Sequence, residues 1–319
     1  MEKYNKGLIL NNRYKIEGLY KVENGYNIYK AEDIRFPGNF WLVHQVLLIN
    51  NSKNLLNNLF SVLNDLSKIV YEKIGKISDY FLDKEYLIVI TEYLNGSLLK
   101  EVIYSSNFSS STVKAIKLGL QLLEIVKYFY EKDLIRFIDL NPENIIIERN
   151  GIIKILYFSI NKLIDLINED GINQNYFVGT FGYIPPEFLD DKISMINQSS
   201  FIYIICAIMY EFITKVPPYL RDDPFIFPPA ITLNSLINIE LSRVLEKNLS
   251  YSTHNRYRTF KEFEKKLYEI LYKETSDIEP QKLPIFSLLK NKLFLGISIF
   301  FFIQIIIIIW LVIYYIMIM

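Results

Sequence analysis

The C-terminal run from Leu293 to Met319 contains no charged residue, and Gln304 is its one strongly polar side chain. A helix crosses the hydrocarbon core of a bilayer with about 20 consecutive apolar residues, so this run can span a membrane with some tilt. A buried core helix is the alternative, but core helices are rarely so long and uniformly uncharged. The run therefore predicts one transmembrane helix at 293–319, which forces the rest of the chain to fold outside the bilayer.

The residues that flank this run predict its orientation. Lys282, Lys290 and Lys292 precede it, and positively charged flanks favour the cytoplasmic side of a membrane. The segment Met1–Ile16 is charged and polar, which excludes an N-terminal signal peptide. We therefore expect a tail-anchored, single-pass membrane protein whose preceding domain is cytoplasmic.

Charge and composition limit the partners and cofactors. The chain has 35 lysine and arginine residues against 35 aspartate and glutamate residues, so its net field does not indicate nucleic acid or another polyanion. One cysteine cannot build a disulfide framework, and two histidines leave little for a metal cluster or a serine-type triad. We expect no nucleic-acid partner and assign no metal site, and the sequence leaves the oligomeric state open.

Two periodicities divide the chain before residue 274. Alternating apolar runs predict strands up to Tyr93, interrupted by one helical pattern, and helical spacing dominates after Leu99. The strand-like runs are Tyr14–Gly18, Gly25–Ala31, Trp41–Leu48 and Tyr86–Tyr93, and the helical stripes are Ser52–Val70, Thr112–Phe129, Phe201–Phe212 and Phe260–Tyr272. This order predicts an α+β architecture of two lobes. An N-terminal tail at 1–12 and a polar linker at 274–290 would flank it.

Several motifs follow one another in the order typical of one family. They are Arg13–Leu19 with Tyr29–Asp33, Asp139-Leu-Asn-Pro-Glu-Asn144, Ile152–Ser159, Val178-Gly-Thr-Phe-Gly-Tyr-Ile-Pro-Pro-Glu187 and Asn255–Phe260. Together they resemble the first strands, catalytic loop, metal-binding loop, activation-segment end and arginine-bearing turn of bacterial Ser/Thr protein kinases. The resemblance implies a protein-kinase-like domain at 13–273. Its β-rich N-lobe would be about 13–93 and its α-helical C-lobe about 99–273.

The residues that would hold phosphate in such a kinase are replaced. Phosphoryl transfer needs a glycine loop, a lysine paired with a helix glutamate, carboxylates on magnesium and a base. The loop glycines fall on Lys21, Glu23 and Tyr26, and the lysine falls on His44, whose imidazole is a poor substitute for an ammonium group. In the helical pattern that should supply the glutamate, Asp65 is the one acid.

The catalytic loop keeps part of the chemistry. Asp139 matches the family's base and Asn144 its magnesium-binding asparagine, although short polar side chains also commonly cap turns beside proline. Asn141 replaces the lysine that contacts the transferred phosphate. Tyr157 replaces the metal-binding aspartate, and its phenol is neutral at pH 7. ATP and magnesium are therefore expected as cofactors only if the chain is active.

The resemblance also assigns the positions around a nucleotide. Thr91 would be the gatekeeper, and Glu92 and Tyr93 would belong to the hinge. The walls around adenine would be Ile28, Leu42, Ile146 and Leu156, and His44 and Tyr157 would lie near the phosphates. Since apolar walls also make a good core, the sequence leaves open whether a pocket exists.

Positions that support the fold are kept. Glu187 and Arg256 match the buried ion pair that ties the activation segment to the C-lobe in the family. Removing one partner of a buried pair typically costs about 3 to 5 kcal/mol, so keeping both favours a folded lobe.

Three hypotheses follow from this pattern. The first is a membrane-tethered pseudokinase that binds cytoplasmic proteins as a regulatory module. The second is a divergent Ser/Thr protein kinase that uses Asp139 as its base and transfers the ATP γ-phosphate to protein hydroxyls. The third is a decaying gene product with neither role.

Overall fold

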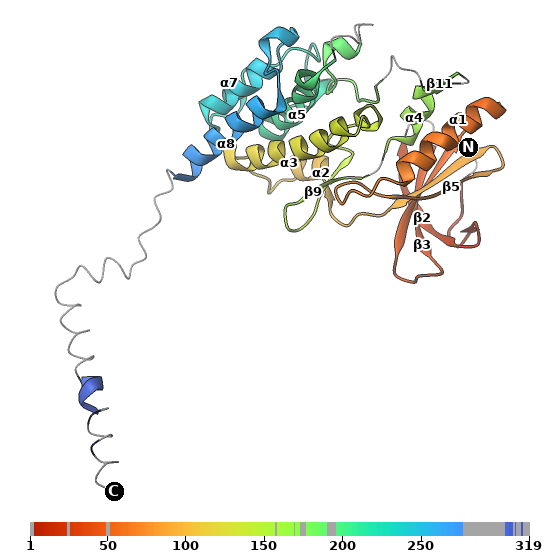
Figure 1. The fold of residues 1–319 in the computed structure, drawn as a ribbon, viewed down its shortest axis with the longest axis horizontal. Helices are drawn as coiled ribbons and strands as arrows, with labels where there is room; N and C mark the ends of the chain where they lie inside the picture. Colours follow the sequence, from red (N-terminus) through yellow and green to blue (C-terminus); the bar gives the residue numbers. More distant parts are fainter. Residues whose placement is uncertain are drawn as a thin grey trace. The chain divides into compact units, whose positions relative to one another are not determined.

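The computed structural model describes residues 3–23, 26–48, 52–156, 158–168, 170–172, 177–189, 196–276, 304–308, 310 and 314. The chain divides into two compact units, residues 1–271 and 272–319. Within the first unit, a strand-rich half is followed by a helix-rich half, so the predicted two-lobed α+β order is confirmed (Figure 1).

Six antiparallel strands form the sheet of the first lobe, in the order β1-β2-β3-β4-β6-β5. Their bounds are β1 (Ile9–Leu10), β2 (Tyr14–Glu23), β3 (Tyr26–Asp33), β4 (Phe40–Leu47), β5 (Ile77–Asp83) and β6 (Tyr86–Glu92). The predicted strands correspond to β2, β3, β4 and β6. The helix α1 (Lys53–Ser67) begins at Ser52, whose hydroxyl accepts a hydrogen bond from the Leu55 amide.

Both faces of this sheet are buried, because neighbouring residues alternate between two apolar clusters. Ile28 and Leu42 belong to the cluster that continues into the second lobe. Their neighbours Tyr29 and Val43 belong to a second cluster on the opposite face. The residues expected around a nucleotide therefore point toward the second lobe.

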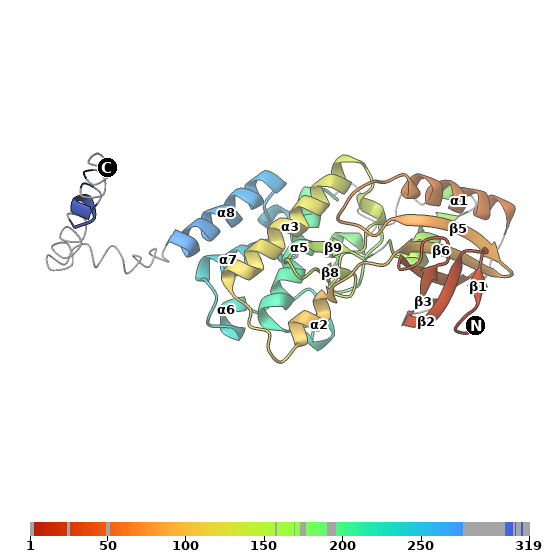
Figure 2. The same ribbon diagram turned by 90° about the horizontal axis from the view of Figure 1, so that it is seen from below.

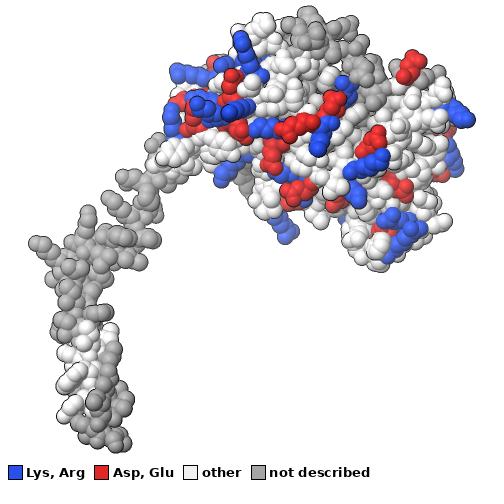
Figure 3. All heavy atoms as spheres, viewed as in Figure 1, with Lys and Arg blue, Asp and Glu red and all other residues white. Residues whose placement is uncertain are grey.

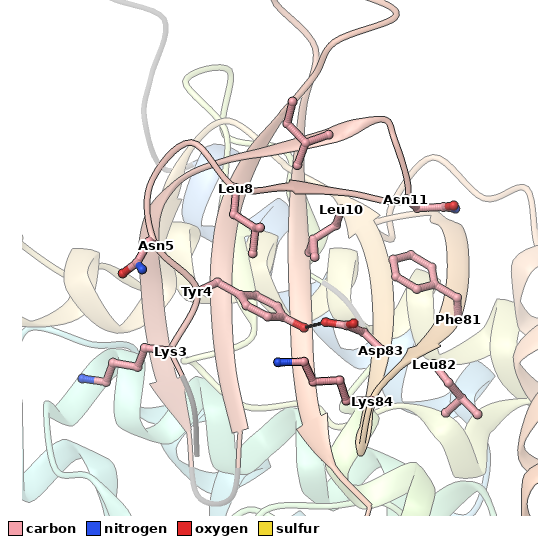
Figure 4. A pocket seen from close by; sticks show the side chains of 11 residues that line it. Lys3, Tyr4, Asn5, Leu8, Leu10, Asn11, Phe81, Leu82, Asp83 and Lys84 are labelled. Carbon is pink, nitrogen blue, oxygen red and sulfur yellow. Dashed lines mark hydrogen bonds between the residues drawn. The ribbon is translucent and has the colours of Figure 1, made fainter.

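Residues 3–12, which belong to the N-terminal tail expected at 1–12, cover that opposite face. The Tyr4 hydroxyl donates a hydrogen bond of 2.5 Å to Asp83, and its backbone amide bonds the Tyr29 hydroxyl. Figure 4 shows Tyr4 pointing across the sheet toward Asp83 at the edge of a cavity of about 590 Å³. Polar and charged residues in this segment concealed its packing from a hydropathy argument.

Helices dominate the second lobe, with α5 at its centre. Every residue of α5 from Ser199 to Ile213 is buried, and α3 and α7 pack against it (Figure 2). The helices are α2 (Leu99–Tyr104), α3 (Thr112–Glu131), α5 (Gln198–Thr214), α6 (Ala230–Leu233), α7 (Ile239–Asn248) and α8 (Phe260–Ser276). Short 3-10 turns are η1 (Ile135–Phe137), η2 (Pro186–Phe188), η4 (Pro218–Leu220) and η5 (Thr253–Asn255), and a small sheet comprises β7 (Ser97–Leu98), β8 (Ile145–Ile147) and β9 (Ile153–Ile155).

A short segment that the sequence did not predict lies between the lobes. The helix α4 (Ile160–Leu166) contacts β4, and the hairpin that follows it, β10 (Ile167–Asn168) and β11 (Gly171–Ile172), contacts α1 (Figure 1). Ile160 and Leu163 are fully buried. A helix of seven residues makes only about two turns, so its apolar periodicity is too short to be recognised in the sequence.

The C-terminal unit, residues 272–319, contains the predicted linker and the predicted membrane span. Helix α8 extends to Ser276, into the linker expected at 274–290. The rest of that linker, and most of 293–319, lie outside the described residues. No helix in the part of the chain that the structure describes has both the length and the apolar character for a membrane crossing.

Candidate functional site

Two aromatic rings occupy the positions expected for phosphate-binding groups. His44 is fully buried in β4, and its Nε2 atom forms a hydrogen bond of 2.9 Å with Oγ1 of Thr91. The ring of Tyr26 stacks on the imidazole, with centroids 6.1 Å apart and planes at 30°. The residue at the third glycine position therefore packs against the residue at the lysine position.

Six of the side chains predicted around a nucleotide are inaccessible to solvent. Exposures of at most 2% are found for Ile28, Leu42, His44, Thr91, Ile146 and Leu156. Of the predicted hinge, Glu92 is exposed and Tyr93 is half-buried. Tyr157 lies outside the described residues. Because the walls of an open pocket are reached by solvent, these six residues form a packed core.

Two residues of β2 contact the predicted hinge and the catalytic loop. The ring of Tyr20 packs edge-on against Tyr93, with centroids 5.9 Å apart. The ammonium group of Lys21, at the first glycine position, lies 3.7 Å from Glu143 of the catalytic loop, which also pairs with Lys100 at 2.6 Å. The strand that should arch over phosphate is thus tied to the opposite lobe.

Helix α1 does not supply a carboxylate to His44. Its acid Asp65 forms a 3.0 Å ion pair with Lys68, and both side chains are about two-thirds exposed, at 67% and 65%. The inward face of α1 is apolar and includes Leu59 and Leu63. The described residues of α1 therefore contain no partner for an ammonium group at position 44.

Asp139 and Asn144 lie together, as the catalytic-loop motif predicts. The Asn144 side-chain amide donates a hydrogen bond of 2.9 Å to the Asp139 carbonyl oxygen. The Asp139 carboxylate is 3% exposed and accepts hydrogen bonds of 2.9 Å from the Thr180 hydroxyl and 3.3 Å from the Ser159 hydroxyl. The loop keeps its fold even though its surroundings have changed.

Lys162 is the functional-site residue that sequence reasoning missed. Its ammonium group lies 2.5 Å from Oδ2 of Asp139 and also donates to the Thr180 hydroxyl at 2.8 Å and the Gly179 carbonyl at 2.9 Å. Asn141, at the expected lysine position, donates its amide to Thr180 at 3.0 Å. The missing lysine at 141 was the available signal, but nothing in sequence spacing connected it with a lysine on α4.

The donor set does not fit magnesium bound between phosphates. A hard cation of this kind is held by carboxylates that stand free to coordinate it. Here a phenol stands at Tyr157, where the metal-binding carboxylate is expected, and the nearby carboxylate of Asp139 is engaged by Lys162. Within the described residues, no group of three or more histidine, cysteine or acidic side chains could hold a metal ion.

Glu187 and Arg256 form a buried bidentate ion pair. The guanidinium nitrogens lie 2.6 and 3.1 Å from the two carboxylate oxygens, and both side chains are at most 5% exposed. Ser200 of α5 donates a further 2.7 Å hydrogen bond to Glu187, and the guanidinium lies over the ring of Tyr203. This pair ties η2 to the turn that follows η5 within the second lobe.

A cavity of about 390 Å³, here called the Thr180 cavity, opens beside the catalytic loop. Glu211 of α5 is buried beneath it and accepts hydrogen bonds from the hydroxyls of Tyr104 and Tyr183 at 2.6 and 2.5 Å. Burial, reinforced by Glu211, raises the pKa of Tyr183, so that this hydroxyl stays a donor. The cavity is lined by Lys100, Glu143, Thr180, Phe181, Tyr183, Glu211, Pro217, Pro218, Tyr219, Arg221 and Pro224.

Curated relatives of the chain are protein kinases. MAP3K epsilon protein kinase 1 of Arabidopsis thaliana is 26% identical over 223 residues, which cover 69% of this chain and 16% of that protein. A probable serine/threonine-protein kinase of Clostridium perfringens is 22% identical over 267 residues, covering 80% of this chain and 38% of that protein. Serine/threonine-protein kinase PknB of Mycolicibacterium smegmatis is 22% identical over 191 residues, covering 57% of this chain and 30% of that protein. The chain thus spans well under half the length of each.

Solved structures show the same fold. The apo form of PpkA-294 superposes with a TM-score of 0.64 at 15% identity, covering 84% of this chain and 99% of that one. The crystal structure of Rad53 residues 1–466 in complex with AMP-PNP gives a TM-score of 0.60 at 18% identity, covering 81% of this chain and 65% of that one.

The family model that describes the protein kinase domain matches residues 45–281. The match begins after the strands in which the loop glycines are replaced, and it includes Asp139, Asn144, Glu187 and Arg256. Together with the bacterial serine/threonine kinases among its relatives, this match shows that the chain belongs to the protein kinase family, as a relative of the bacterial Ser/Thr kinases.

Proposed function

We propose that this chain is a membrane-tethered pseudokinase, a kinase-fold domain that binds cytoplasmic protein partners and does not transfer phosphate. The observation that carries the proposal is the buried stack of Tyr26 on His44. Two rings fill the region where phosphoryl transfer requires cationic and metal-binding groups. The exposures of at most 2% along the adenine walls support the same conclusion.

The Thr180 cavity supports a binding role. Phe181 and Tyr219 are 59% and 74% exposed at its rim, and three prolines line it. Exposed aromatic side chains beside a preformed hollow are typical of surfaces that bind polypeptides. On the face shown in Figure 3, charges of both signs are interspersed over the domain, which fits a protein partner better than a polyanion.

Membrane tethering is proposed from the uncharged run at 293–319 and the lysines before it. The test is alkaline carbonate extraction of cell membranes that contain the full chain. The chain is expected to stay with the membrane and to be released when 293–319 is deleted. Release of the intact chain by carbonate would contradict the tether without affecting the pseudokinase proposal.

Activity is tested by incorporation of labelled phosphate from ATP into casein and into the chain itself, with full-length protein purified in detergent. We expect no incorporation above that of Asp139→Ala. Incorporation that Asp139→Ala abolishes would instead support the second candidate, a divergent Ser/Thr kinase. That candidate is favoured by the 2.9 Å bond between Asn144 and Asp139, which keeps the catalytic loop in order.

Binding is tested by selecting peptides from a displayed random library on the immobilised full chain. Enriched peptides should lose binding at least about tenfold with Phe181→Ala, corresponding to about 1.4 kcal/mol. Tyr268→Ala is the matched control, because Tyr268 is similarly exposed, at 54%, but does not line the cavity. Equal loss with both variants, or no enrichment, would count against this site.

A further inference from the structure

We propose that Lys162 is a latch that holds α4 between the lobes and couples the position of α4 to the shape of the Thr180 cavity. The coupling rests on the proposed use of that cavity for partner binding. The latch itself can be measured without any partner.

The first support is the completeness of the Lys162 contacts. An ammonium group has three N–H donors, and three acceptors lie within 3 Å of it: Asp139 at 2.5 Å, Thr180 at 2.8 Å and Gly179 at 2.9 Å. The acceptors belong to the catalytic loop and to the segment that precedes η2. One side chain on α4 therefore joins three segments that are distant in sequence.

The second support is the charge that Asp139 requires. Its side chain is 4% exposed, and a buried carboxylate is costly unless it is paired. Asn141 contributes a neutral amide to the neighbouring Thr180, and Lys162 supplies the cation. Moving α4 away would leave Asp139 buried with neutral partners, which opposes the movement.

The third support is that α4 is too short to be stable as an isolated helix. A helix as short as Ile160–Leu166 is marginal in water without tertiary contacts, and Ser159 makes no side-chain capping bond to it. The fully buried Ile160 and Leu163 and the ion pair of Lys162 hold it in place. Loss of the ion pair would therefore loosen the helix while its apolar contacts remain.

The connection to the cavity runs through Thr180. Its hydroxyl donates to Asp139 and accepts from both Lys162 and Asn141, and the same residue lines the cavity. The preceding Gly179 packs tightly, because a Cβ there would come within 2.2 Å of Ile184. If Lys162 moves with α4, the Thr180 hydroxyl loses the hydrogen bond that it accepts from the ammonium group. The cavity wall at Thr180 should therefore change when α4 moves.

Hydrogen–deuterium exchange of the full chain in detergent tests the latch. Lys162→Met should raise exchange at least about tenfold in 158–168 and 177–183, the segments that the ammonium group joins. Lys154→Met is the matched control, since Lys154, on β9, forms its 2.8 Å ion pair with Glu148, which is on neither of the two segments. Its exchange in both segments should match the parent chain. Lys162→Arg, which keeps the charge, should restore most of the protection.

A double variant keeps the test decisive if Lys162→Met fails to fold. Lys162→Met combined with Asp139→Asn leaves no unpaired buried charge, so it should fold and still show the raised exchange in both segments. Unchanged exchange in 158–168 would overturn the latch. Raised exchange in 158–168 with no change in 177–183 would overturn the coupling and leave the proposed partner site untouched. If the exchange results support the latch but the parent chain binds no peptide, the proposed function would be contradicted and the latch would stand.

Discussion

The ring of Tyr26 stacks on the buried imidazole of His44, with centroids 6.1 Å apart. One residue takes the place of a phosphate-binding glycine and the other the place of a phosphate-binding lysine. With glycine at position 26 the imidazole would face unfilled space, and with lysine at position 44 the buried site would have to hold a charge. Together they fill the space, so the lost chemistry has been replaced by core packing.

Restoring the lysine should therefore damage the fold. His44→Lys would bury an ammonium group with no carboxylate on α1 to pair with it, and an unpaired buried charge typically costs about 3 kcal/mol or more. We expect that loss in the free energy of unfolding, measured by urea denaturation. His254→Lys, at the exposed second histidine, is the control and should change stability by less than about 0.5 kcal/mol. Equal stability of the two variants would contradict the packing account.

The ion pair of Glu187 and Arg256 should be the most sensitive charge pair of the second lobe. Glu187→Gln or Arg256→Met leaves a buried charge with a neutral partner and should cost about 3 to 5 kcal/mol. Lys265→Met is the control, because its 3.9 Å pair with Glu269 is largely exposed and worth at most about 1 kcal/mol. A double-mutant cycle on Glu187 and Arg256 should show strong coupling, and additive losses would refute a direct interaction.

Gly75 should be irreplaceable at the junction of the two lobes. A Cβ there would lie 2.2 Å from the Leu156 carbonyl oxygen, which is backbone and cannot simply rotate away. Gly75→Ala should therefore destabilise the chain by about 1 to 3 kcal/mol in thermal or urea unfolding. Gly18→Ala is the control, since nothing lies within 4 Å of the added atom. Similar midpoints for both variants would show that the lobes are not fixed at this contact.

Alkaline pH should destabilise the fold partly through Cys206. Burial raises the pKa of this thiol above its ordinary value of 9.0. Above that pH the unfolded chain releases the proton while the folded chain keeps it, so stability falls by up to about 1.4 kcal/mol per pH unit from this group. Burial raises the pKa of Tyr71 and Tyr210 to about 12, and they add to the loss above pH 10.

The measurement is the slope of unfolding free energy between pH 9 and pH 10, which should be shallower in Cys206→Ala than in the parent chain. The native thiol should also resist a thiol-reactive dye and react only after unfolding. An unchanged slope together with rapid labelling of the native chain would place the thiol at the surface.

The elements whose apolar residues recur at regular spacing could be predicted from the sequence. Their spacing is regular because one face of the helix or strand must be buried. The stripes of α3, α5 and α8 and the alternation in β4 and β6 are of this kind. Strand β5 was missed because Ser78 and Asp79 interrupt its alternation. Motif order located Asp139 and Asn144 beside each other, since a contiguous loop carries both.

What the sequence could not predict depends on contacts between distant segments. Lys162 reaches Asp139 from a helix whose position is set by tertiary packing, and no spacing rule links the two residues. The filled state of the pocket was also beyond reach, because Leu42 and Ile28 suit an adenine wall and a core equally well. Only the three-dimensional stack on His44 distinguishes these two uses.

Direct titration of the full chain with magnesium-ATP, followed by its thermal unfolding midpoint, tests the central claim that the nucleotide site is closed. A ligand that binds the folded state must raise the midpoint, by an amount equivalent to about 2.7 kcal/mol at one hundred times its dissociation constant. We predict no shift at millimolar nucleotide. A saturable shift that disappears in both Asp139→Asn and Asn144→Ala would show an open, metal-binding nucleotide site and contradict the account.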